Sequence, residues 1–446
     1  MMEVLTEAQR LGAEFADVRY YAAKTMTITA SETREIVNNY GLVGGYAVRA
    51  LVKGNWGYFT TNGDVDSSSV RAAVQSAPSV QGNVKVVLLS PRSDRVTVQV
   101  KYPLNRGPED VMIEARKLRD NVLAADQRIR AVTVSYSQVE VEKGYWSTDG
   151  RDIELKYSIS RLSVTATAKE GEVVASAYVG ASTYLGYAFE AFDVNQLVET
   201  LLRRLRGQLK GVTVKPGAYP VILGPEVSGV FAHEALGHLA EADDATEGIL
   251  GRLRGKKIGR EFVNVSDSPS LDNPMAIGIT PYDDEGVEGR EVKILEKGVV
   301  KEFMNNRAYA ARLGDEPTGN GRAEDFRSSV LVRMRNTYFK PGDMTLDEML
   351  REVREGYLLL SPLGGQTSPD GTFQFGIQEG YHVVNGEARE PIRGAGIAGY
   401  TIETIGNMDG VSKDFQVWPG VCGKWGQSVY VGTGGPYVRV SSLKVG

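Results

Sequence analysis

The chain has 446 residues, of which 42% are hydrophobic and 24% are charged, and its 51 basic and 56 acidic side chains give a net charge of −5. This composition excludes wholesale disorder and a collagen-like fibre. Because the chain has no excess of positive charge, nucleic-acid binding is not expected to be its main function. No apolar run long enough to span a membrane and no secretory signal is visible. The lone Cys422 cannot form an internal disulfide, so we expect a cytoplasmic location.

The length predicts about three domains. We expect an N-terminal α/β domain over residues 1–90, a central α+β domain over 100–212 and a C-terminal domain over 217–446. The 51 glycines show no repeat and therefore indicate tight turns in a β-rich protein. The predicted fold class is α+β: a β-rich multi-domain chain with a Gly-rich C-terminal β domain that carries a distorted metal-binding helix.

The first segment is predicted to open with a helix and to continue in short strands. Alternation of apolar with polar residues gives the strands, and glycines mark the turns. The predicted helices span 6–16 and 67–76, and the predicted β segments span 17–21, 25–30, 35–40 and a Gly-rich stretch over 41–61.

The central segment is predicted to open with an amphipathic helix over 108–126 and to close with another over 195–208. Between them, the apolar residues of 132–136 alternate as in a strand. Those of 139–141 continue in the opposite phase, which predicts a bulge or a break near Gln138.

The third segment follows a linker over 211–217 and opens with an apolar strand over 219–223. A Gly-Pro turn comes next, and a helix is predicted to begin near Glu226. The remainder is typical of Gly-rich β structure with one amphipathic helix over 345–355.

Two of the three histidines lie close together, in the motif HExxxH from His233 to His238. A helix turns about 100° per residue, so a spacing of five places the imidazoles about 140° apart, against about 40° for a spacing of four. A regular helix could not easily aim both at one ion. The motif predicts that the helix widens into a π turn or ends near His238, with Gly237 tolerating unusual backbone dihedrals.

Two imidazoles are too few to bind zinc, and Cys422 is the strongest candidate for a third ligand. Thiolate and imidazole favour zinc over magnesium or calcium, and three protein ligands leave the open position that catalysis needs. Glu234 follows the first histidine, where HExxH enzymes hold their general base. The alternatives are a structural histidine pair and a cysteine that is an inert small hydrophobe. His382, in a strand-like stretch, is expected to have no functional role.

The segment HEALGHLAEAD, from His233 to Asp243, resembles the signature of the TldD/PmbA family of zinc-dependent peptidases, specifically its TldD-type catalytic members. The resemblance extends over nearly the whole chain, more loosely in its first two segments. Further similar blocks, in the family's order within the third segment, are 283–286, 317–322, 333–338, 422–428 and 431–432.

This resemblance implies zinc ligands at His233, His238 and Cys422 and a catalytic glutamate at Glu234. It also implies one Zn²⁺ per chain, peptide or unfolded protein substrates, and a dimer with a family paralogue or with a second copy of the chain. Partner-type members lack HExxxH, so its presence here favours an active subunit.

Four further residues are candidates by position. Glu241 and Asp243 follow His238 closely, and either could accept the free ring N–H of a ligating histidine; alternatively, both are solvated acids after a helix end. Asn320 and Arg322 could donate hydrogen bonds to a substrate carbonyl or carboxylate, with a structural turn as the alternative.

The predicted activity is hydrolysis of peptide bonds in short or unfolded polypeptides, with zinc-bound water activated by Glu234. A β-rich interior suggests that an extended peptide adds as a strand to a sheet edge. The rivals are a non-hydrolytic peptide- or partner-binding subunit of a TldD/PmbA-type complex and a zinc amidase that acts on small molecules.

Overall fold

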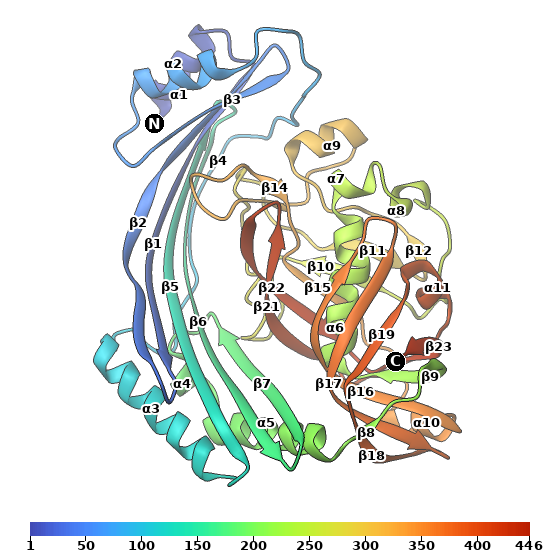
Figure 1. Cartoon of the computed structure of the whole chain (residues 1–446). Coiled ribbons are helices and arrows are strands. Elements are labelled where there is room, and N and C mark those ends of the chain that lie inside the picture. Colours follow the sequence, from blue (N-terminus) through green and yellow to red (C-terminus); the bar gives the residue numbers. More distant parts are fainter.

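The amino-terminal half of the chain forms one long, curved sheet, drawn in blue to green in Figure 1. The computed structural model describes residues 1–446, apart from the side chain of Met2. The strands are β1 (Phe15–Ala30), β2 (Glu35–Val52), β3 (Asn55–Thr61), β4 (Arg92–Thr97), β5 (Ile129–Ser147), β6 (Arg151–Glu170) and β7 (Val173–Thr183). Their order is β3-β2-β1-β5-β6-β4, and β7 pairs with β6.

Helices cover the two ends of this sheet. Near one end lie α1 and α2, and near the other lie α3, α4 and α5 (Figure 1). Their bounds are α1 (Met2–Arg10), α2 (Ser67–Ser76), α3 (Pro108–Ala124), α4 (Ala188–Ala191) and α5 (Val194–Lys210). The helices predicted over 67–76, 108–126 and 195–208 are thus confirmed, the last two with small changes at their ends.

Long strands replace the short strands predicted for the first segment. β1 and β2 have 16 and 18 residues and pair along almost their whole lengths. Polar residues interrupt the apolar pattern where β2 is exposed, so the alternation breaks although the hydrogen-bonded ladder continues. The helix predicted over 6–16 is α1, which starts earlier and ends at Arg10, shortly before Gly12 adopts a φ of +89°.

Along β5 the buried side chains change from one face of the strand to the other, and no bulge causes this change. The ladders to β1 and β6 both continue through Gln138 without a shift of register. Tyr136 belongs to the core under α3 and α5, whereas Val139 and Val141 lie on the opposite face and pack with Ile277 of the carboxy-terminal half. The predicted bulge was wrong because the buried side of the strand changes from one face of the sheet to the other.

Two further sheets form the carboxy-terminal half, drawn from light green to red in Figure 1. The first has the order β12 (Val299–Val300), β11 (Val292–Glu296), β10 (Val265–Ser268), β15 (Asn336–Phe339), β22 (Gln427–Gly435) and β21 (Gln416–Lys424). The second has the order β16 (Glu355–Thr367), β9 (Gly217–Leu223), β23 (Val438–Val445), β19 (Ala395–Tyr400), β17 (Thr372–Val384), β18 (Glu387–Arg393) and β8 (Val212–Thr213), with β20 (Met408–Val411) beside β23.

Short elements connect these sheets. The hairpin of β13 (Gly321–Arg322) and β14 (Leu331–Val332) is separate from both. The helices are α6 (Pro225–Phe231), α7 (Ala242–Ala245), α8 (Ile249–Arg252), α9 (Arg307–Leu313), α10 (Leu346–Arg351) and α11 (Thr401–Gly406).

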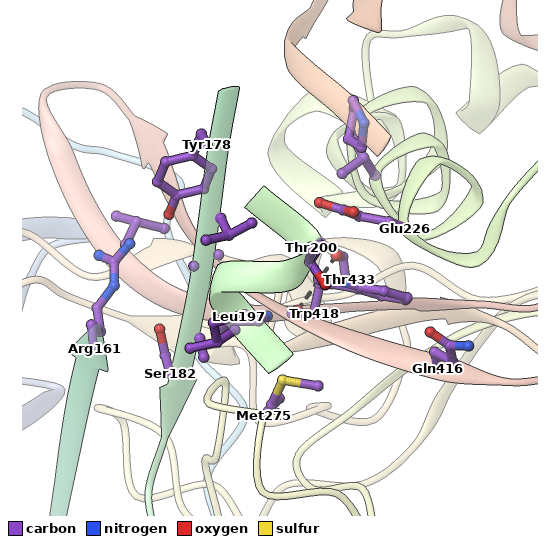
Figure 2. Close-up of a pocket in the computed structure, with 18 of the residues that line it drawn as sticks. Arg161, Tyr178, Ser182, Leu197, Thr200, Glu226, Met275, Gln416, Trp418 and Thr433 are labelled. Carbon is purple, nitrogen blue, oxygen red and sulfur yellow. Dashed lines mark hydrogen bonds between the residues drawn. The ribbon is translucent and has the colours of Figure 1, made fainter. Parts of the chain in front are cut away.

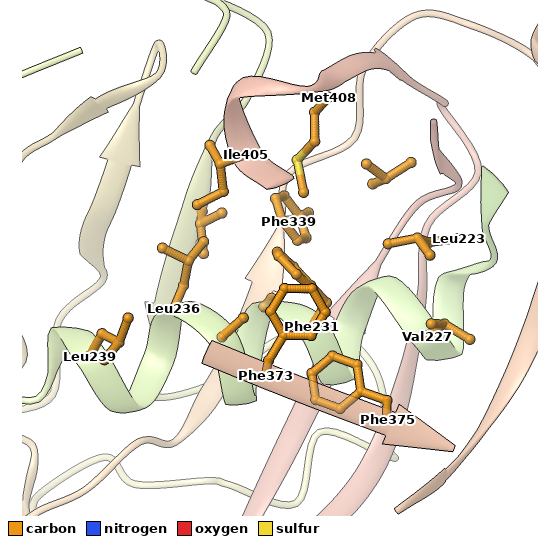
Figure 3. Packing of buried hydrophobic residues seen from close by; sticks show 14 of the residues in the cluster. Leu223, Val227, Phe231, Leu236, Leu239, Phe339, Phe373, Phe375, Ile405 and Met408 are labelled. Atoms are coloured by element: carbon orange, nitrogen blue, oxygen red, sulfur yellow. The ribbon is translucent and has the colours of Figure 1, made fainter. Parts of the chain in front are cut away.

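Helix α6 lies between the two sheets, where it contacts β21 and β22 of one and β9 and β16 of the other. Phe231 at its end meets Phe373 and Phe375 of β17 edge to face and stacks on Phe339 of β15 (Figure 3). Large aromatic side chains contribute much of the burial energy of a core. This cluster therefore anchors the end of α6 and sets where the chain continues into the histidine motif.

The third segment differs from the prediction in two details. Residues 211–217 are not a linker throughout, because β8 pairs in parallel with β18. The helix predicted over 345–355 spans only Leu346–Arg351, since the chain enters β16 at 355. The predicted strand over 219–223 and the helix near Glu226 are confirmed by β9 and α6.

The fold is β-rich and multi-domain, as predicted. Strands from the first two predicted domains share the long sheet, since β1 pairs with β5. The division at residues 1–90, 100–212 and 217–446 stays a prediction. Within the described part of the chain, no helix combines the length and apolar character needed to cross a bilayer.

A buried ion cluster joins the long sheet to the carboxy-terminal half. Arg49 on β2 donates to Asp17 on β1, with Nε 3.0 Å from Oδ1, and to Glu285, with Nη1 3.0 Å from Oε1. All three side chains are almost fully buried. Burial alone would lower the pKa of Arg49, but the two carboxylates raise it well above its usual value. One guanidinium therefore serves two buried carboxylates, and both lose this partner if Arg49 is removed.

We expect Arg49→Met to lower the free energy of unfolding by about 3–5 kcal/mol, because Asp17 and Glu285 would stay buried without their cation. Arg116→Met is the matched control, since Arg116 pairs with Glu35 on the surface and its loss should change stability far less. Urea unfolding of the three proteins measures the difference. Equal losses for the two variants would contradict the assignment.

Candidate metal centre

Helix α6 continues into a π turn that carries both histidines of the HExxxH motif. The π-helical residues are Ala232–Gly237, and a 3-10 turn follows over His238–Ala240. The ring centroids of His233 and His238 lie 5.2 Å apart with an interplanar angle of 82°. The predicted π turn is confirmed: widening the helix brings residues five apart close to one face.

Gly237 permits this turn by leaving space, not by an unusual backbone. Its φ of −58° and ψ of −52° are ordinary helical values, so the turn does not use the tolerance of unusual dihedrals that the sequence suggested. A Cβ at this position would lie 2.0 Å from the Sδ atom of Met334, which is fully buried. The close approach of the helix to Met334 therefore explains the glycine.

The lone cysteine reaches the histidines from β21, the last strand of its sheet. Cys422 is buried, and its Sγ lies 3.5 Å from Nε2 of His238. The candidate ligand atoms of His233, His238 and Cys422 all lie within 4.8 Å of one another. The structure thus brings the three predicted ligands together, although 184 positions separate His238 from Cys422.

The chemistry of this donor set fits zinc. Imidazole nitrogen and thiolate sulfur favour zinc over the hard cations magnesium and calcium. Three protein ligands leave one tetrahedral position open, as in catalytic sites, whereas structural sites close all four. Within the described residues, the buried Nδ1 of His233 has no hydrogen-bond partner, so internal hydrogen bonds do not satisfy the cluster completely.

Glu241 orients the second histidine. Its fully buried carboxylate accepts hydrogen bonds from Nδ1 of His238 at 3.0 Å, from Nζ of Lys424 at 3.0 Å and from the backbone N–H of Met334 at 3.2 Å. This contact fixes the ring so that Nε2 faces Cys422. Burial alone would lower the pKa of His238, but Glu241 and Cys422 raise it well above its usual value. Burial alone would raise the pKa of Glu241, but His238 and Lys424 lower it to about 2.

Lys424 connects the helical segment to β21. Its buried Nζ lies 2.8 Å from Asp243, 2.9 Å from Asp244 and 3.0 Å from Glu241. Of the two acids predicted to accept a ring N–H, the structure therefore places Glu241 on His238 and Asp243 on Lys424. Burial raises the pKa of Asp243, and Lys424 offsets only part of this rise. Lys424 therefore links the helical segment that carries the two histidines to the strand that carries Cys422.

The electrostatics of the cluster favour a thiolate. Burial alone would raise the pKa of Cys422, but the charge of His233 and hydrogen bonds from His233 and His238 lower it to about 5. Burial alone would likewise lower the pKa of His233, but the thiolate of Cys422 raises it. The thiolate is the form of cysteine that binds metals, so these electrostatics suit Cys422 as a metal ligand.

Glu234 lies where two cavities meet. One, of about 690 Å³, is lined by His233 and Glu234 and is bounded by β7, α5 and β21 (Figure 2). The other, of about 430 Å³, is lined by Glu234, His238 and Cys422 and by the end of β16. The Glu234 side chain is 25% exposed, and its Oε2 lies 3.9 Å from Nε2 of His238. One carboxylate therefore faces both cavities beside the three candidate ligands.

The remaining predicted residues lie around the cluster or away from it. Asn320 is fully buried and donates to the carboxylate of Asp267, and Arg322 donates to the backbone carbonyl of Met334. These bonds hold the segment against which Gly237 packs, so a structural role is observed, and contact with a substrate stays a prediction. His382 lies on β17, outside the cluster.

Two residues that support the cluster were not predicted from the sequence. Lys424 could have been found, because residues two apart on a strand share a face and the acids of 241–244 need a cation. Arg333 donates to the backbone carbonyl of Cys422 at 2.6 Å and so holds this strand in place. No local pattern indicates that contact, since it joins segments distant in the sequence.

Comparisons with known proteins agree over the whole chain. Models of the PmbA/TldA metallopeptidase match as domain 1 over 16–80, central domain over 101–209 and C-terminal domain over 216–446. A zinc metalloprotease TldD homolog from Saccharolobus solfataricus is 43% identical over 446 residues, which is 100% of this chain and 99% of that protein. A metalloprotease from Methanothermobacter thermautotrophicus is 34% identical, over 97% of this chain and 95% of its own. The crystal structure of TldE from Thermococcus kodakarensis has the same fold, with a TM-score of 0.79, 19% identity and 99% of each chain covered.

In the metal-free protein we expect iodoacetamide to alkylate Cys422 with a pH midpoint near 5. A lowered pKa keeps the thiolate present at neutral pH, so the rate should fall only as the pH drops through that value. The chain unfolded in guanidinium is the control, with an expected midpoint of about 8.5. His233→Ala should move the folded midpoint upward, and a folded midpoint above about 8 would contradict the described electrostatics.

Proposed function

Because the chain belongs to the PmbA/TldD metallopeptidase family, we propose that it is a zinc-dependent peptidase that hydrolyses peptide bonds in short or unfolded polypeptides. The observation that carries this proposal is the convergence of His233, His238 and Cys422 beside Glu234, at the junction of two cavities. The two histidines and the cysteine would hold one zinc ion per chain. When bound there, zinc supplies Lewis acidity toward a scissile carbonyl and toward water.

Glu234 is the proton carrier in this proposal. Its carboxylate is partly exposed and faces both cavities, so it can take a proton from the attacking water and deliver it to the leaving amine. Glu241 and Lys424 act indirectly. They hold the His238 ring and β21 in place before a substrate arrives, so no reorganisation of these groups is needed during the reaction.

Two strand edges beside the site support the binding of an extended peptide. β21 is the last strand of its sheet, and β16 pairs with β17 along its length but with β9 only over 357–359 within the described chain. Both strands line the cavities that contain Glu234. Their free backbone groups can pair with the main chain of a peptide, which gives affinity with little side-chain selectivity. Folded proteins do not offer such a segment, hence the preference for unfolded ones.

We also propose a cytoplasmic dimer with a family paralogue or with a second copy of the chain. An open edge of the long sheet supports it: β3 covers β2 over 46–52, and the preceding part of β2 pairs with β1. On this part Tyr40 is 63% exposed and Leu42 is 77% exposed. An apolar open edge is a ready surface for pairing with another chain. TldE from Thermococcus kodakarensis has the same fold, so a chain of this shape can be a protein of another name.

Substitutions at the site separate hydrolysis from binding. We expect Glu234→Gln to keep zinc and to lower kcat by about 10²–10⁴-fold, because the proton carrier is lost. Cys422→Ser should lose both zinc and activity. Glu247→Gln, an exposed acid of the same segment, should change neither.

Zinc content by elemental analysis and cleavage of casein, unstructured peptides and small amides measure these effects. Full zinc occupancy and activity in Cys422→Ser would contradict the ligand assignment. A wild-type protein that binds peptides but cleaves nothing would identify a non-hydrolytic subunit, and cleavage restricted to small amides would identify an amidase.

Peptides with methylated backbone nitrogens test strand addition. N-methylation removes a main-chain donor without changing any side chain, so methylation at alternate positions flanking the scissile bond should raise KM by about tenfold or more. Methylation of a residue near the end of the peptide, beyond the reach of both edges, is the matched control. If both peptide sets are cleaved like the unmodified peptide, the substrate does not bind as an added strand.

A further inference from the structure

A third cavity continues the space beside the site between the long sheet and the carboxy-terminal half. It measures about 880 Å³ and is lined by β1, β2, β5 and β6 on one side and by β22 on the other. Arg161 of β6 and Val421 of β21 line both this cavity and the one of about 690 Å³ that contains Glu234. Arg161 therefore stands where the two spaces adjoin.

Arg161 has no counter-ion among the described residues. The other cations of the 690 Å³ cavity are paired, since Arg203 and Arg204 both donate to Glu379. In the 880 Å³ cavity, Lys143 is paired with Asp284. Two other arginines line this cavity. Arg327 is paired with a carboxylate, and Arg322 donates to backbone carbonyls. Arg161 is thus the one cation of these two cavities, within the described chain, that is left without an acceptor.

The position of Arg161 on its strand directs it toward the cavities. Residues two apart on a strand share a face, so Arg161 lies on the same face as Ile159. Ile159 packs with Ile277 of the carboxy-terminal half, whereas Leu162 lies on the other face in the core under α3 and α5. The cross-strand neighbour Ser182 is small and leaves the guanidinium room. Figure 2 shows Arg161 on the sheet wall of the cavity, which Tyr178 also lines.

A half-buried guanidinium without a partner has lost part of its hydration and gained no acceptor in return. Its planar donors match a carboxylate, which can accept two parallel hydrogen bonds. The neighbouring cations already donate to carboxylates or backbone carbonyls, so Arg161 is the cation of this wall whose donors are still available. Arg161 can therefore bind an anion, and a carboxylate is the anion that peptides carry.

We propose that Arg161 binds a carboxylate of the peptide substrate and so selects which peptides the site holds. This inference rests on the proposed peptidase function. The carboxylate is either the C-terminal group of the peptide or the side chain of an aspartate or glutamate. Main-chain pairing with β16 and β21 does not distinguish one peptide side chain from another. Arg161 adds a contact that depends on the charge of the peptide. Arg161 is a binding residue in this scheme and takes no part in proton transfer.

Peptide binding to the zinc-loaded full chain tests the proposal. Glu234→Gln serves as the parent protein, so that bound peptides are not consumed. Four versions of one unstructured hexapeptide are titrated by calorimetry: a free acid, its C-terminal amide, the amide with one internal glutamate, and the amide with glutamine there. Arg161→Gln is added to the parent, and Arg203→Gln, a cation of the same cavity already paired with Glu379, is the matched control.

We expect the parent to bind one carboxylate-bearing peptide at least about tenfold more tightly than its neutral counterpart. Arg161→Gln should abolish this preference and leave the affinity for the amide unchanged within about twofold, while Arg203→Gln keeps the preference. A preference for the free acid over the amide identifies the C-terminus, and one for glutamate over glutamine identifies a side chain.

Two results would overturn the proposal. If Arg161→Gln retains the preference of the parent, or weakens all four peptides equally, Arg161 does not bind a substrate carboxylate, although the peptidase function can still stand. If the parent binds none of the four peptides, the proposed function itself fails and this inference fails with it.

Discussion

The five-residue spacing of His233 and His238 is the constraint on which the site depends. A regular helix would point these imidazoles in different directions, and only a widened turn brings them to one side. The turn forms at the end of α6, which the aromatic cluster around Phe231 holds between two sheets. Gly237 then lets the turn pack directly on Met334, where any Cβ would collide. Local helix geometry and core packing thus define two of the three candidate ligands.

Charge joins this turn to the third ligand. Oε2 of Glu241 accepts from both His238 and Lys424, and Lys424 stands two residues from Cys422 on β21. Breaking a buried pair of this kind leaves an uncompensated charge, so the helical segment and the strand are held in register. His233 and His238 in turn lower the pKa of the Cys422 thiol, and β21, as the last strand of its sheet, lines the cavities beside them. Structural support and the proposed chemistry therefore use the same residues.

Patterns within one segment predicted most of what was right, and ligand chemistry predicted one distant contact, that of Cys422 with the histidines. Spacing within 233–238 was enough to predict the π turn, because helix geometry relates neighbouring residues directly. The long strands β1 and β2 were divided into short ones, since exposed polar residues break the alternation without breaking the ladder. The phase change near Gln138 was mistaken for a bulge, because one sequence cannot show that a sheet is buried on both faces. The contact of Arg333 with β21 joins distant segments and leaves no local pattern.

Anomalous diffraction from a crystal of the zinc-loaded protein, measured on both sides of the zinc absorption edge, locates the metal relative to the two histidines and the cysteine. We expect one peak per chain, about 2.0–2.1 Å from a nitrogen of His233 and of His238 and about 2.3 Å from the sulfur of Cys422. A peak elsewhere in the chain, or one that the sulfur does not coordinate, would contradict the ligand assignment.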